Sequence, residues 1–428
     1  MRYYSIHQIE KKVGFSQAVE DSLAPDGGLY VPEVLPRRKV AWQENYAQFA
    51  YDLLQDFLVD DPLLHSCLPI CEQAFNFPVV LKKMNEQLSF LELFHGPTAS
   101  FKDFGARHLA QISRHMGHDK DRLIMVATSG DTGSAVAAAF HQVPHVRVVI
   151  MYPHQMVSKR QAHQLACWGD NILTLAVEGD FDDCQRLLKT ALNKHRHDER
   201  FAMTTANSIN IGRLLPQVAY FAYASLLHTQ DGHDRMHVIV PSGNVGNATA
   251  AYWAREMGYP LGDIVLAQNE NHTVVDYLQT GKYEKRATRS TIANAMDVGD
   301  PSNFARLRHL YSDFATFQSR VKADWLTDTQ IKAAIQDAYA QTQVPICPHT
   351  AAAYGLVEKL DQKHWVVVAT ADPAKFESVV EPLLDTHVPL PEMMKQQLSR
   401  PEVFQKIPAT MSALMEAVDQ WWVNVLDN

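Results

Sequence analysis

The residues best suited to chemistry surround Lys102, in the run Leu-Phe-His-Gly-Pro-Thr-Ala-Ser-Phe-Lys-Asp-Phe-Gly that ends at Gly105. The apolar stretch Leu88–Phe94 predicts a strand, and the apolar spacing after Ser100 predicts a helix with that serine as its N-cap. Lys102 then falls in the first helical turn, where the helix dipole disfavours a cation. Phenylalanines lie close by, so we expect a lowered pKa, which a lysine needs to form a Schiff base at neutral pH.

A second candidate region is the turn Ser-Gly-Asn-Val-Gly-Asn that begins at Ser242, between a predicted strand and a predicted helix. Its glycines let the backbone point N–H groups inward, and the helix start adds positive potential, so the turn is suited to bind a phosphate. It lacks the Gly-Lys-Ser/Thr ending of a P-loop. Taken alone, such a Gly-Asn turn is more often only a turn. The candidate phosphate cradle comprises Gly243, Asn244, Val245, Gly246 and Asn247.

Further candidate site residues are polar residues that follow other predicted strands. Because the carboxyl ends of parallel strands meet at one edge of a sheet, these residues are expected to gather there. Arginine suits an anion because its guanidinium offers a bidentate fork. Each residue also has an ordinary role, as a helix cap or a surface group. The set consists of Asp131, Thr132, Asn207, Ser208, Arg213 and Thr370.

Strands and helices alternate along most of the chain, which predicts an α/β fold with parallel sheets covered on both faces. The part before these repeats is mixed, with a helix expected over 42–63 and a hairpin around Asn85. We divide the chain into an N-terminal domain (1–88), a smaller α/β domain with the lysine (89–210) and a larger α/β domain with the glycine turn and the C-terminal helices (211–428). The predicted strands cover 88–94, 123–128, 146–152, 172–177, 236–240, 264–268 and 365–370.

Composition narrows the class of protein. The 428 residues carry a net charge of −9 and no long basic run, which argues against a nucleic-acid partner. No apolar run approaches the length of a membrane span, and the first residues lack the apolar core of a signal peptide. The 5 cysteines suit a reducing compartment, so we expect a cytoplasmic protein. His233 and His237 run from a turn into a predicted strand, and we predict no metal site.

Three phrases of the sequence resemble one known family. The run from His95 to Gly105 is similar to the lysine motif of threonine synthases, and Asp-Gly-Gly-Leu-Tyr-Val-Pro at 26–32 is similar to a second motif of that family. Asn-Ala-Met-Asp-Val at 294–298, with Pro-Ser-Asn-Phe at 301–304, is similar to a third. The resemblance implies a pyridoxal-phosphate enzyme of fold type II, the tryptophan synthase β-like fold. In that fold two open parallel-sheet domains hold the cofactor between them, here with an added N-terminal domain.

The resemblance also implies a reaction and a role for each candidate. Threonine synthases convert O-phospho-L-homoserine and water to L-threonine and phosphate, the last step of threonine biosynthesis. Lys102 would carry the pyridoxal 5'-phosphate, and the turn from Gly243 to Asn247 would hold the cofactor phosphate. Asp131 matches the position beside the ring hydroxyl, and Thr370 the position beside the pyridine nitrogen. The substrate phosphate would be bound by Thr132, Asn207, Ser208 and Arg213.

Two departures from the family pattern flank these residues: Ala99-Ser100 replaces what is often Leu-Ala, and Asp372 stands where the family often has His. Three alternatives remain open. A serine/threonine dehydratase shares the fold but needs no second phosphate site. A homologue without activity would serve as a binding protein, although Lys102 is intact. A nucleotide-binding module would lack its lysine motif. We expect a monomer or homodimer that binds a small-molecule substrate.

Overall fold

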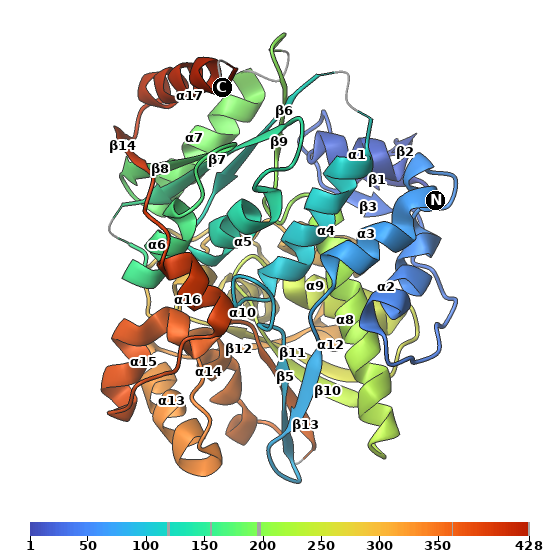
Figure 1. Ribbon diagram of the computed structural model, residues 1–428. Helices are drawn as coiled ribbons and strands as arrows, with labels where there is room; N and C mark the ends of the chain where they lie inside the picture. Colours follow the sequence, from blue (N-terminus) through green and yellow to red (C-terminus); the bar gives the residue numbers. More distant parts are fainter. Residues whose placement is uncertain (118–119, 155, 195–197, 362, 427–428) are drawn as a thin grey trace.

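The structure is a computed structural model that describes residues 1–117, 120–154, 156–194, 198–361 and 363–426. It has two α/β halves, each built on its own sheet, and a smaller N-terminal part (Figure 1). The five-stranded sheet lies in the upper part of the view and the six-stranded sheet in the lower part. Within the described ranges, no helix is both long and apolar enough to cross a membrane.

The six-stranded sheet has the order β12-β11-β10-β13-β5-β4. Neighbouring strands in this sheet are parallel except for β4 and β5, which are antiparallel and form the hairpin predicted around Asn85. The core strand β13 is buried along its whole length, as a parallel strand covered on both faces should be. The strands are β4 Val80–Lys83, β5 Leu88–Glu92, β10 Met236–Pro241, β11 Leu261–Gln268, β12 Lys322–Trp325 and β13 Trp365–Ala369.

The five-stranded sheet has the order β14-β8-β7-β6-β9 and is parallel throughout. Successive side chains of its strands enter different cores, because side chains alternate across a sheet. In β7, Val148 packs into the large core between the two sheets, whereas Val149 packs under the outer helices. The strands are β6 Arg122–Ala127, β7 Val146–Pro153, β8 Ile172–Glu178, β9 Ala202–Thr205 and β14 Gln405–Pro408.

Helices cover both faces of the two sheets, as the alternating pattern predicts. Several of them begin directly after a strand, so that their first turns point toward the space between the sheets. The complete set of α-helices in the described part of the two halves is α4 Lys102–His115, α5 Asp131–Phe140, α6 Lys159–Ala166, α7 Phe181–Lys194, α8 Ile211–Gln230, α9 Gly246–Glu256, α10 Thr273–Thr280, α11 Phe304–Leu310, α12 Phe314–Arg320, α13 Asp328–Thr342, α14 Pro348–Tyr354, α15 Glu377–Leu384, α16 Glu392–Leu398 and α17 Met411–Leu426.

The N-terminal part differs from the helix expected over 42–63. The helix begins after Asn45, whose side chain accepts a hydrogen bond from the Gln48 N–H, and it passes into 3₁₀ turns from Gln55. Pro62 then starts a separate short turn because it cannot continue a helix. The elements here are β1 Tyr3–Ser5, β2 Gln8–Val13, α1 Phe15–Asp21, β3 Tyr30–Pro32, α2 Tyr46–Leu54 and α3 Cys67–Ala74.

The two sheets do not follow the predicted chain ranges. Strand β5 crosses the predicted boundary at 88/89 and pairs with β13, so it belongs to the sheet of the 211–428 range. Strand β14 falls within 211–428 but pairs with β8 of the other sheet. The predicted boundaries therefore do not separate the sheets. An apolar run indicates a buried strand, but which strand pairs with it depends on packing between distant segments of the chain.

Candidate active site

A cavity of about 450 Å³ lies between the two sheets. Strands β6, β10 and β13 end at its wall, and helices α4, α5, α8 and α9 begin there. In such folds ligands bind at the carboxyl ends of the strands. The cavity is lined by every site residue that the sequence predicts, namely Lys102, Asp131, Thr132, Asn207, Ser208, Arg213, Gly243, Asn244, Val245, Gly246, Asn247 and Thr370.

Lys102 is the first residue of α4, as predicted, but the expected N-cap is wrong. Phe101 occupies the cap position, and the helix start has no side-chain cap. Ser100 instead forms a β-bridge with Ala371, and the Phe101 N–H donates to the Thr370 carbonyl at 2.8 Å. The chain after β13 thus fixes the segment before the lysine, a long-range contact that the local sequence does not reveal.

The Lys102 side chain is 14% exposed, and its Nζ lies 3.6 Å from Asp131 Oδ2. Burial lowers the pKa of Lys102, because the charged amine loses water. The carboxylate of Asp131 opposes this shift, while the positive charges of Lys375 and Arg213 add to it. The lowered pKa agrees with the sequence prediction, with burial as the main cause.

Asp131 connects this lysine to a second one. Its Oδ1 lies 3.1 Å from the Nζ of Lys375 and accepts a hydrogen bond from Gln161 Nε2 at 2.9 Å. Burial alone would raise the pKa of Asp131, but the charges of Lys375 and Lys102 outweigh it and hold this pKa well below its usual range. Asp131 is therefore ionised at neutral pH.

Lys375 is the main residue that sequence reasoning missed. It is fully buried, and its Nζ donates to the Thr98 carbonyl at 2.6 Å. It lies in the short 3₁₀ helix η5 (Pro373–Phe376), which is capped by Asp372 through the Ala374 N–H at 2.8 Å. The aspartate that departs from the family pattern therefore has a structural role as a cap. The only feature of the sequence that could have indicated Lys375 is its position, a few residues after the predicted site residue Thr370.

The glycine turn has the shape of an anion cradle. Val245, the residue before α9, has a φ of +62°, a strained conformation for a β-branched residue and one that often marks functional sites. A Cβ on Gly243 would lie 2.7 Å from the Met296 backbone, so only glycine fits there. The first N–H groups of an α-helix such as α9 have no partners within the helix, so they are suited to bind an anion.

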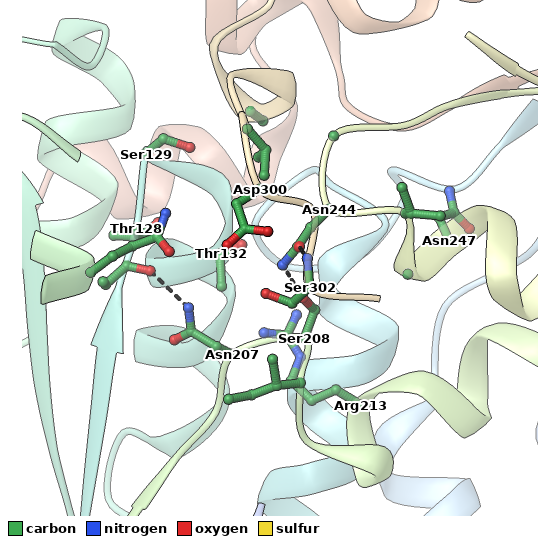
Figure 2. Close-up of a pocket in the computed structure, with 18 of the residues that line it drawn as sticks. Thr128, Ser129, Thr132, Asn207, Ser208, Arg213, Asn244, Asn247, Asp300 and Ser302 are labelled. Carbon is green, nitrogen blue, oxygen red and sulfur yellow. Dashed lines mark hydrogen bonds between the residues drawn. The ribbon is translucent and has the colours of Figure 1, made fainter. Parts of the chain in front are cut away.

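Side chains from other loops hold this turn in place. Asn244 donates to Ser208 Oγ at 2.6 Å and accepts from the Ser302 N–H at 2.6 Å (Figure 2). Asn303 also donates to Ser208 Oγ, at 3.2 Å. The Pro-Ser-Asn-Phe phrase at 301–304 therefore supports the glycine turn.

Arg213 lies in a second polar region of the cavity wall. Its Nη1 donates to the Ala206 carbonyl at 2.6 Å, but its Nε is buried without a partner among the described residues. Burial lowers the pKa of Arg213 to about 10, which leaves the guanidinium charged at neutral pH. In Figure 2, Thr132, Asn207 and Ser208 converge with Arg213 on the same space from different elements.

The residues present fit pyridoxal 5'-phosphate. A lysine with a lowered pKa faces the cavity, and a glycine cradle for a phosphate lies in the same wall. Asn247, in the first turn of α9, has a buried Nδ2 with no partner among the described residues. Thr370 lies directly after β13, is 6% exposed and lines the cavity.

Comparisons with known proteins agree with this fit. Residues 78–371 match the family described as "Pyridoxal-phosphate dependent enzyme". Residues 2–75 match "Threonine synthase N terminus", and residues 350–418 match "Threonine synthase, C-terminal". Together these matches cover all the parts of the chain that line the cavity.

Relatives match over nearly the whole chain. The threonine synthase of Haemophilus influenzae is 38% identical over 419 residues, which cover 94% of this chain and 95% of the relative. The crystal structure of threonine synthase from Escherichia coli has a TM-score of 0.91 and 34% identity, with 98% of this chain and 100% of that chain covered. The structure of PLP-bound threonine synthase from Brucella melitensis has a TM-score of 0.90 and 28% identity, with 98% and 99% covered.

Proposed function

The chain belongs to the threonine synthase family of pyridoxal-phosphate-dependent enzymes, and we propose that it converts O-phospho-L-homoserine and water to L-threonine and phosphate. One observation supports the proposal: a single cavity is lined by a lysine of lowered pKa and by two separate regions suited to bind an anion. One region is the turn Gly243–Asn247, and the other centres on Arg213. A phosphorylated substrate beside a phosphorylated cofactor requires both.

The cofactor would be held by residues from both halves. The N–H groups of the turn Gly243–Asn247 would bind its phosphate, and Lys102 Nζ would hold it covalently. Asp131 would lie beside the ring hydroxyl, and Thr370 beside the ring nitrogen, where a hydroxyl does not favour a protonated ring as a carboxylate would. When bound, pyridoxal phosphate supplies an electron sink for bonds at the substrate amino acid.

Lys102 would also carry protons. The Lys102 amine lines the cavity, and burial lowers its pKa. In its neutral form this amine would accept a proton from the α carbon of the substrate and then exchange protons at the β carbon. Asp131, held ionised by Lys375, would keep a fixed negative charge 3.6 Å from this amine throughout.

The Arg213 region would bind the substrate phosphate. The unpartnered Nε offers one charged donor, and Thr132, Asn207 and Ser208 line the same space. The phosphate would leave from the γ carbon, and water would add at the β carbon. Retained near Arg213, the departing phosphate would be placed to activate that water. We propose further that the enzyme acts in the cytoplasm, as a monomer or homodimer.

Product analysis tests the proposal. Purified enzyme with O-phospho-L-homoserine should form threonine and phosphate in equal amounts, measured by amino-acid analysis and a phosphate assay. The same enzyme with threonine alone should form little oxoacid. Efficient deamination of threonine, with phosphohomoserine inert, would instead identify a dehydratase of the same fold.

A further inference from the structure

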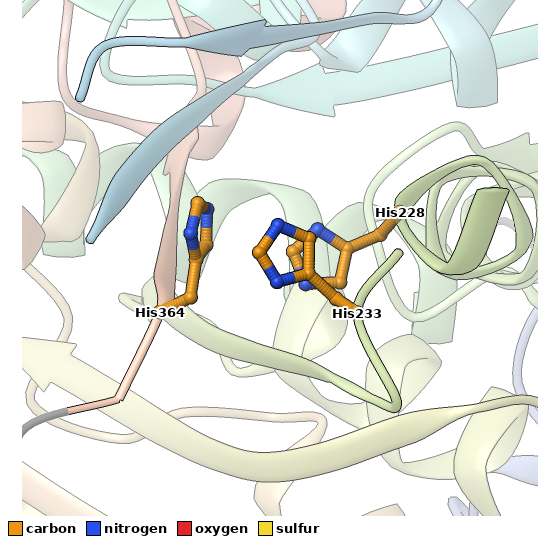
Figure 3. Close-up of side chains that lie close together, drawn as sticks. All are labelled: His228, His233 and His364. Atoms are coloured by element: carbon orange, nitrogen blue, oxygen red, sulfur yellow. The ribbon is translucent and has the colours of Figure 1, made fainter. Parts of the chain in front are cut away.

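Three histidines gather at the end of the six-stranded sheet opposite the cavity. His228 lies in the last turn of α8, His233 in the turn that follows, and His364 directly before β13 (Figure 3). One ring nitrogen from each lies within 4.8 Å of the other two. His228 and His233 are close in the sequence, and the fold brings the distant His364 beside them.

The ring of His228 carries an unsatisfied group. It is 1% exposed, and its Nε2 is buried without a hydrogen-bond partner among the described residues. Leaving a buried polar atom unpaired costs about 1–3 kcal/mol. Such an atom calls for a ligand, and the nearest side chains that could share one are the other two imidazoles.

His364 is oriented by neighbours in the way that metal-binding histidines usually are. Its Nδ1 lies 3.1 Å from the Glu86 carbonyl oxygen, which fixes the proton on that nitrogen and leaves the lone pair on Nε2. Nε2 lies 2.9 Å from Ser89 Oγ, a weak partner that a metal ion can displace. The ring therefore presents Nε2 as a ligand atom.

Burial, together with the neighbouring His233 and His364, lowers the pKa of His228 to about 4. Burial likewise lowers the pKa of His364. The neutral imidazole is the form that binds metals.

We propose that His228, His233 and His364 bind one divalent transition-metal ion of the Zn²⁺ class, with water as the remaining ligand. Imidazole nitrogens suit zinc, copper and nickel, and a zinc–nitrogen bond is about 2.0–2.1 Å long. The ligand nitrogens must therefore move closer together than the 4.8 Å limit of the present arrangement.

His233 is the residue that would move. Its ring stacks on that of His228, with centroids 4.2 Å apart and an angle of 7° between the planes, so the two lone pairs do not point at one ion. His233 is half-buried and follows Gly232, whose φ of +92° marks a tight turn. A rotation of this one side chain out of the stack completes the site without disturbing α8 or β13.

The position of the site indicates a structural role. Helix α8 leads from His228 back to Arg213, and β13 leads from His364 to Thr370. A metal ion would fasten the far ends of α8 and β13, whose other ends form the cavity wall. It would thus raise stability while taking no part in the reaction.

Cobalt titration of the untagged, chelator-treated holoenzyme tests this site. Wild-type protein should bind one Co²⁺ per chain, with ligand-field absorption bands that Zn²⁺ abolishes, and Zn²⁺ should raise the melting temperature. His233→Gln, on the half-buried turn, should weaken Co²⁺ binding at least tenfold and remove the bands. His364→Gln should do the same.

The matched control is His141→Gln, because His141 pairs with Asp170 at the end of α5, away from the cluster. It should bind Co²⁺ as wild type does, and threonine formation should be unchanged in His233→Gln. The proposal is overturned if wild type binds no Co²⁺ in excess of that bound by His233→Gln, or if His141→Gln weakens binding equally.

Discussion

The segments after β5 and β13 each direct a buried lysine toward Asp131, yet the two lysines are held differently. Lys375, after β13, is fully buried, donates to the Thr98 carbonyl at 2.6 Å and lies 3.1 Å from the carboxylate. Lys102, after β5, is 14% exposed, lies 3.6 Å from the carboxylate and lines the cavity. Lys375 is committed to protein partners, whereas the Lys102 amine is free to meet a ligand.

This difference shows how one carboxylate can serve two cations. A buried charge is tolerated only when it is paired and hydrogen-bonded. Lys375 supplies Asp131 with a permanent partner, so Asp131 can stay ionised when Lys102 loses its charge on bonding to a cofactor. The lysine with fewer partners is then the one suited to react, and the other is suited to hold the charge balance.

The largest effect should follow Lys102→Ala. This variant should form no measurable threonine from phosphohomoserine, because both the covalent link and the proton carrier are removed. The cofactor should still bind through the glycine turn, but dialysis should remove it far faster than from wild type. Threonine formation at the wild-type rate would remove Lys102 from the reaction.

Lys375→Met should act on stability first. The change keeps most of the length of the side chain and leaves Asp131 with one cation fewer, and breaking a buried pair costs about 3–5 kcal/mol. Urea unfolding should report this loss, while covalent attachment of the cofactor should persist. The control is Lys395→Met, whose ion pair with Glu392 is exposed and screened by solvent. Equal effects of the two substitutions would contradict the role given to Lys375.

His349 adds a third basic group near Asp131, and its effect should depend on pH. Burial lowers its pKa to about 4, and its Nε2 accepts the Ala295 N–H at 3.1 Å. The unfolded imidazole therefore binds a proton that the folded one does not, and stability is lost as pH falls from about 6.5 toward 4. The loss is about 3 kcal/mol for such a shift.

The check is the free energy of unfolding near neutral pH and near pH 5, for wild type and for His349→Gln. The difference between the two pH values should be smaller in the variant, although other buried histidines such as His108 keep part of it. An unchanged difference would mean that His349 does not carry the expected shift.

Arg213→Ala should give the smallest effect of the series. A charge-assisted hydrogen bond contributes about 1.5–3 kcal/mol, so kcat/KM for phosphohomoserine should fall roughly tenfold to a hundredfold. Cofactor loading should be unaffected, which absorbance of the holoenzyme measures. The pKa of Lys102 should also rise, because the Arg213 charge lowers it. Loss of cofactor together with activity would instead assign Arg213 to cofactor binding.

Much of this arrangement could be predicted from the sequence, for a physical reason. The apolar run that becomes β13 and the glycine turn before α9 are local patterns, set by burial and by backbone freedom. Because parallel strands present their carboxyl ends at one edge, residues as distant as Lys102 and Thr370 were expected together. The structure gathers both at one cavity.

Contacts between distant segments could not be predicted in the same way. The pairing of β5 with β13, the bridge between Ser100 and Ala371, and the contact of Lys375 with Asp131 all depend on how the two halves pack. Neither hydrophobic period nor residue type specifies such partners. For the same reason, the histidine cluster at the other end of the sheet is invisible in the sequence.

Peptide mapping of the reduced holoenzyme identifies the lysine that bonds to the cofactor. Borohydride would make the lysine–cofactor bond permanent, and mass spectrometry of the digest would then locate the added mass. We predict the added mass on the peptide that contains Lys102, with the peptide that contains Lys375 unmodified. Modification of Lys375, or of a lysine outside the cavity, would contradict the account.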